Sequence, residues 1–84
     1  MSNQVTINES TKADALELIA TIKDTVITSN TSNKADIEDV LLQVEEDVRA
    51  NKKPRKGLLT ALKVLCQVGA VAIPFVTALI DLFV

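Results

Sequence analysis

The residues of this chain that could take part in chemistry are carboxylates, ammonium and guanidinium groups and one thiol. Histidine, tyrosine and tryptophan are absent from its 84 residues. Without histidine, the usual nucleophilic triads, imidazole acid–base catalysis and zinc-protease motifs are excluded. The two glycines, Gly57 and Gly69, are isolated and form no phosphate-binding loop. We therefore expect no enzymatic activity and no cofactor.

The remaining candidate ligands for a metal are the acidic side chains between residues 36 and 47. Their spacing does not follow a calcium-binding EF-hand loop, and no glycine stands where the loop would turn. We interpret them as the solvated face of a helix. The single cysteine, Cys66, lies in an apolar run and can form no internal disulfide. Such a position favours a buried, unreactive thiol, so no metal site is expected.

Four cations surround Pro54 and form what we call the basic joint: Lys52, Lys53, Arg55 and Lys56. They could be a solvated linker whose charges complement the carbonyl end of a preceding helix. They could instead flank a membrane segment or attract anionic lipid. A third reading pairs them with acidic side chains of a neighbouring molecule. Binding to nucleic acid is not expected, because the net charge is −2 and the only aromatic residues are two phenylalanines.

Two amphipathic helices are predicted before the basic joint. Apolar residues recur every three to four positions, at Ala15, Ile19, Ile22, Val26, Ile37, Val40, Leu41, Val44 and Val48. With Thr11 as an N-cap, the first stripe predicts a helix over 11–28. With Asn33 as an N-cap, the second predicts a helix over 34–51. The short polar connection favours an antiparallel hairpin, and the polar residues 1–10 are expected to form a flexible tail.

The final third of the chain is almost entirely apolar. From residue 58 onward only Lys63 and Asp81 are charged. After the joint at 52–57, the sequence predicts one apolar helix over 55–83 that is kinked near Pro74. A split there is the alternative, because proline lacks a backbone donor but suits the first turn of a new helix.

Polar side chains in this segment fall on one line at heptad-like spacing. This polar stripe comprises Thr60, Lys63, Gln67, Thr77 and Asp81. The other faces are apolar and wider than two partner helices can bury, so the excess should meet another copy or a helical partner protein. The expected interface consists of Leu58, Leu62, Leu65, Val68, Ile73, Phe75, Leu79, Leu82 and Phe83.

The fold class is therefore predicted as all-α, a single domain over 1–84 in which a helical hairpin and the apolar C-terminal helix form a three- or four-helix bundle. The expected function is a non-enzymatic self-association or protein-interaction module, homo-oligomeric and cytoplasmic because no signal peptide is seen. One alternative is a tail-anchored or pore-forming protein of the inner membrane, with residues 58–80 as the membrane segment and a cytoplasmic N-terminus. Another is an inhibitor or antitoxin-like partner of a basic protein.

Residues 44–65 read VEEDVRANKKPRKGLLTALKVL and are followed by an apolar helical tail. This order resembles a segment of the small helical domains in bacterial abortive-infection proteins of the AbiTii type. There an acidic helix, a proline-containing basic turn and an apolar alanine/leucine helix succeed one another. The resemblance covers the C-terminal half. It implies a bacterial source, a phage-defence context and a role in protein–protein association, and it transfers no catalytic residue.

Overall fold

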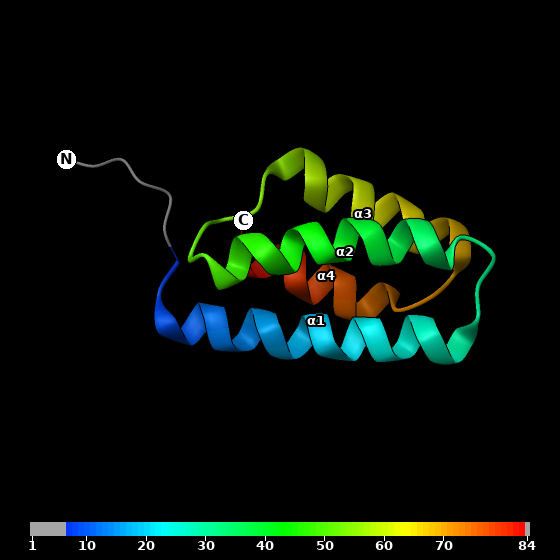
Figure 1. Cartoon of the computed structure of the whole chain (residues 1–84), viewed down its shortest axis with the longest axis horizontal. Coiled ribbons are helices and arrows are strands. Elements are labelled where there is room, and N and C mark those ends of the chain that lie inside the picture. The colour runs from blue at the N-terminus through cyan, green and yellow to red at the C-terminus, as the bar shows by residue number, and fades with distance from the viewer. Residues whose placement is uncertain (1–6, 84) are drawn as a thin grey trace.

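The computed structural model describes residues 7–83, which form four α-helices and, within that range, no strand. The helices are α1 (Glu9–Ser29), α2 (Lys34–Arg49), α3 (Lys56–Gly69) and α4 (Ile73–Leu82). Successive helices run antiparallel and pack against each other, and α4 also packs against α1, which closes the ring (Figure 1). The predicted all-α class is confirmed, and the number of helices is four.

The first helix begins two residues before the predicted start, because Asn8 rather than Thr11 is its N-cap. The Asn8 Oδ1 accepts a hydrogen bond of 2.7 Å from the Thr11 backbone N–H. Ile7 packs against the core, and its N–H donates to the Asn51 carbonyl at 3.3 Å. The prediction of a flexible tail is therefore wrong for its last four residues, and residues 1–6 lie outside the described part of the chain.

The second helix ends at Arg49, two residues earlier than predicted. Asn51 adopts the left-handed conformation at φ 63°, and the Lys52 N–H donates to the Asp47 carbonyl at 2.8 Å. This pair is typical of a helix end that satisfies its last carbonyls locally. At the other end, Asn33 precedes α2 but its side chain makes no capping hydrogen bond. The predicted capping role of that side chain is therefore wrong.

Of the two alternatives for the apolar segment 55–83, the structure has the split near Pro74 rather than one kinked helix, since two separate helices occupy it. The helix α3 ends at Gly69. Ala70 and Ala72, which follow it, both have left-handed backbones, at φ 53° and 56°. The Val71 N–H donates back to the Cys66 carbonyl at 3.0 Å, which closes the end of α3. Pro74 follows in the first turn of α4, where a missing N–H costs no helical hydrogen bond. The short α4 therefore folds back along α3.

The core lies between the four helices and takes one stripe from each. Its buried side chains within the helices are Ala15, Ile19, Ile22, Val26, Ile37, Leu41, Val44, Val48, Leu59, Leu62, Cys66, Val76 and Leu79. The predicted apolar stripes of α1 and α2 are thus buried, with Val40 packed at the margin. Each fully buried Leu, Ile or Val contributes on the order of 1.5–3 kcal/mol. Much of the apolar C-terminal segment is consequently covered by the chain itself.

The segment predicted as an alternative membrane span, 58–80, is divided between α3 and α4, of 14 and 10 residues. Within residues 7–83, none of the helices combines the length and the hydrophobicity that crossing a bilayer requires.

Candidate functional site

The nine residues of the expected interface separate into three groups in the folded chain. Three lie in the core: Leu62, Leu79 and Phe83. Three are half-buried and pack against it: Leu58, Leu65 and Leu82. Three are exposed: Val68, Ile73 and Phe75. Only this last group is a candidate contact surface, since a change at a core position such as Leu79 would alter folding rather than association.

Four apolar side chains of the C-terminal segment are exposed along the last two turns of α3 and the first turn of α4. We call this surface the α3–α4 corner, and it comprises Val64, Val68, Ile73 and Phe75. Their exposed fractions are 49%, 74%, 41% and 38% in that order. Only three residues connect the two helices, so the corner lies at one end of the bundle (Figure 1). Val64 was missed by the sequence reasoning, although it stands one helical turn before Val68.

All five residues of the polar stripe are exposed: Thr60, Lys63, Gln67, Thr77 and Asp81. The stripe does not form a continuous line, because the break after α3 places its last two members on the antiparallel α4. Its residues therefore lie on the outer surface of the four-helix bundle. One of them is engaged locally, since the Thr77 hydroxyl donates to the Ile73 carbonyl at 3.0 Å.

The basic joint is exposed at all four of its cations. Two of them, Lys53 and Lys56, border a groove of about 360 Å³ that we call the α3–α4 groove. Lys63, two helical turns after Lys56 in α3, also borders this groove. The spacing of residues 56, 60 and 63 on one helical face could have indicated this gathering from the sequence. Arg55 instead borders a separate groove next to α2.

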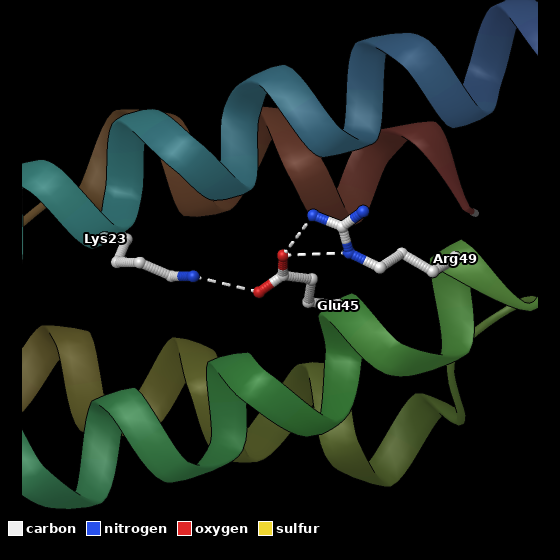
Figure 2. A network of polar contacts seen from close by, with 3 residues as sticks. All are labelled: Lys23, Glu45 and Arg49. Carbon is white, nitrogen blue, oxygen red and sulfur yellow. Dashed lines mark hydrogen bonds and ion pairs between the residues drawn. The ribbon is translucent and has the colours of Figure 1, made fainter.

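Two ion pairs meet at Glu45 of α2, one with Lys23 of α1 and one with Arg49 of α2 itself (Figure 2). The Glu45 side chain is 12% exposed and accepts from Lys23 Nζ at 2.9 Å. Arg49, one turn along α2, donates from Nη2 at 2.8 Å and from Nε at 3.1 Å. The hydrogen bond from Lys23, and then that from Arg49, lower the pKa of the Glu45 carboxyl. This carboxylate is already neutralised within the chain, so it offers little charge to a basic partner.

The single thiol and the carboxylates offer no further site. Cys66 is fully buried, and desolvation raises the pKa of its thiol, which disfavours the reactive thiolate. Across residues 7–83, no three acidic or thiol side chains converge as metal ligands would. The acidic side chains of α2 spread along the helix instead of meeting at a point.

Comparison of the chain with protein families, curated proteins and solved structures gives no match. The resemblance of residues 44–65 to AbiTii-type domains stays a prediction. In the C-terminal segment, the candidate surfaces for function are the α3–α4 corner and the α3–α4 groove.

Proposed function

We propose that this chain is a non-enzymatic helical association module that self-associates through the α3–α4 corner. The observation that carries the proposal is the exposure of four large apolar side chains around one helix connection, led by Val68 at 74%. Exposed apolar surface of this kind is buried when two molecules meet, which releases its ordered water. The resemblance of residues 44–65 implies the same kind of role, protein–protein association.

A second copy of the chain is the partner that suits this surface best. No residue between Lys63 and Asp81 is charged. Most homodimers bring the same patch of both subunits together around a two-fold axis. A charged patch would then oppose like charges, whereas an uncharged apolar patch is complementary to itself. The lack of charge over 64–80 therefore favours a two-fold symmetric dimer.

The size of the corner indicates a weak dimer rather than a permanent one. Its four side chains expose on the order of 300 Å² of apolar surface, below the roughly 800 Å² per partner of a standard interface. Because the core already covers α3 and α4 on their inner faces, neither helix needs a partner in order to fold. We expect a dissociation constant on the order of 10–100 µM.

The decisive test is the Val68→Asp variant, studied by sedimentation velocity and light scattering at about 1 µM to 1 mM, a range that brackets the expected dissociation constant. The unchanged chain should move from monomer to dimer over this range. Val68→Asp should stay monomeric, because its carboxylate would be desolvated in the interface and would face its own copy.

Gln67→Asp is the matched control, since the neighbouring side chain is also exposed but lies outside the corner. It should dimerise like the unchanged chain. Circular dichroism should show equal helicity and equal melting temperatures for both variants. A chain that stays monomeric at the highest concentration, or two variants that dimerise equally well, would contradict the proposal.

A further inference from the structure

The α3–α4 groove combines three ammonium groups with an apolar floor. Its rim carries Lys53, Lys56 and Lys63, and its floor includes Leu59, Ile80 and Phe83. We propose that this groove binds a single-chain aliphatic carboxylate, with the carboxylate at the lysines and the alkyl chain along the floor. The site is separate from the α3–α4 corner, because no corner residue lines the groove.

The positive charge of the three rim lysines favours an anionic ligand. None of the residues that line the groove is acidic. Within residues 7–83, the ion pairs are those of Glu45 with Lys23 and Arg49, so the three rim lysines have no carboxylate partner there. Like charges held in one groove repel each other, and a bound carboxylate would relieve that repulsion.

Two further donors face the same region at the start of α3. Thr60 lines the groove, and its hydroxyl makes no hydrogen bond to another residue within 7–83. By contrast, the hydroxyls of Thr21, Thr25 and Thr77 each donate to the carbonyl four residues earlier. The positive end of the α3 dipole lies at Lys56, and no side chain caps it. These groups add to the attraction that the lysines exert on an anion.

The apolar floor indicates that the anion carries an alkyl chain. Leu59 and Phe83 are each 5% exposed and belong to the core, so their packing forms part of the floor without a ligand. A free inorganic anion would leave this floor wet. The volume of about 360 Å³ is near the lower limit of ligand pockets, which suits one chain of medium length rather than a two-chain lipid.

The test is a titration of the ¹⁵N-labelled full chain with sodium decanoate, below its micelle concentration and at low salt, followed by NMR. Saturable shifts are expected at residues 56–63 and 80–83. Acetate supplies the head alone and decanol the chain alone, and each should bind at least about tenfold more weakly. Raising the salt concentration should weaken decanoate binding, because the rim charges are exposed to solvent.

Variants separate the groove from general charge attraction. The double variant Lys56→Gln/Lys63→Gln should weaken decanoate binding about tenfold. Lys52→Gln is the matched control: it removes an exposed cation of the same joint that does not line the groove, and it should change the affinity less than about twofold. Thr60→Phe keeps the charge but fills the groove, so binding should be lost while helicity by circular dichroism is kept.

Three outcomes would overturn the proposal. Equal affinity for acetate and decanoate would mean that the apolar floor takes no part. The double variant removes two charges and Lys52→Gln removes one, so a loss of about threefold or more in Lys52→Gln would mean that only net charge matters. Binding to phosphatidylglycerol vesicles without binding to monomeric decanoate would assign the lysines to a membrane surface. Because Val68→Asp leaves the groove intact, decanoate should bind that variant normally even if the corner does not dimerise.

Discussion

The Ala70→Gly substitution should stabilise the protein, although glycine normally weakens helical proteins. Ala70 follows the last residue of α3 and has a left-handed backbone at φ 53° and ψ 44°. An L-residue in that conformation costs about 1–2 kcal/mol, which glycine avoids. Glycine in turn loses about 0.5–1 kcal/mol more conformational entropy on folding. The Ala70 side chain is exposed, so no packing is lost, and the net gain should be about 0.5–1 kcal/mol.

The measurement is urea and thermal unfolding followed by circular dichroism. For a domain of this size, a gain of that order should raise the melting temperature by about 4 °C. The matched control is Ala78→Gly, because Ala78 is also exposed but lies within α4. There glycine should lower the free energy of unfolding by about 1 kcal/mol. The two substitutions change the same side chain and should move stability in opposite directions.

The sign of the Ala70→Gly effect tests where the C-terminal segment divides. If α3 continued through residue 70 towards Pro74, glycine there would lie in a helix interior and would destabilise as at Ala78. A melting temperature lowered equally by both substitutions would therefore refute the break between α3 and α4. It would also remove the α3–α4 corner, which exists only because the chain turns back at residues 70–72.

Two other substitutions test contacts between the helices. Gly69→Ala should lower the free energy of unfolding by about 1–3 kcal/mol, although alanine has the better helix propensity. The reason is that a Cβ at residue 69 would lie 2.7 Å from both Asn33 Oδ1 and Thr31 Oγ1. Urea unfolding measures this change. Glu45→Gln should cost about 1 kcal/mol at pH 7, against no change for the exposed Glu46→Gln. Because the folded-state pKa of Glu45 is lowered, its stabilisation is present above about pH 4.5 and is lost as the pH falls through the folded-state pKa, so the cost of Glu45→Gln should shrink in acid.

The first half of the fold was predictable because its apolar periodicity is strong. The four residues that recur in α1, from Ala15 to Val26, are all buried. The ends of the helices were less predictable, since several polar residues compete for the capping positions. Asn8 and Thr11 both suit an N-cap, and in the fold Asn8 takes that position, next to Ile7, whose N–H donates to the Asn51 carbonyl. Similarly, the Asn33 amide donates to the Leu65 carbonyl in α3 at 2.8 Å, a tertiary contact that no local pattern contains.

The break between α3 and α4 opposes the local propensity of its own residues. Alanine is the best helix former, yet Ala70 and Ala72 both take left-handed backbones. Continuing the helix would have left the core stripes of α1 and α2 partly uncovered, whereas folding back lets α4 pack against α1 and α3. Gly69 lies where α3 ends, but its backbone is not left-handed. It instead allows α3 to approach the α1–α2 connection closely.

The same fold-back decides how much of the apolar segment is left for a partner. Mean hydropathy averages over residues 58–83 and does not distinguish their inner and outer faces. The interface expected from the sequence therefore extends along the whole segment. Because the segment turns back, side chains such as Leu62 of α3 and Leu79 of α4 point into the core between the four helices. Both are fully buried. What remains exposed is set by position around each helix, so Val68 is open although Leu65 is half-buried. Val68 has the largest exposed fraction of these side chains, 74%, so the proposed self-association through the α3–α4 corner should be most sensitive to Val68→Asp.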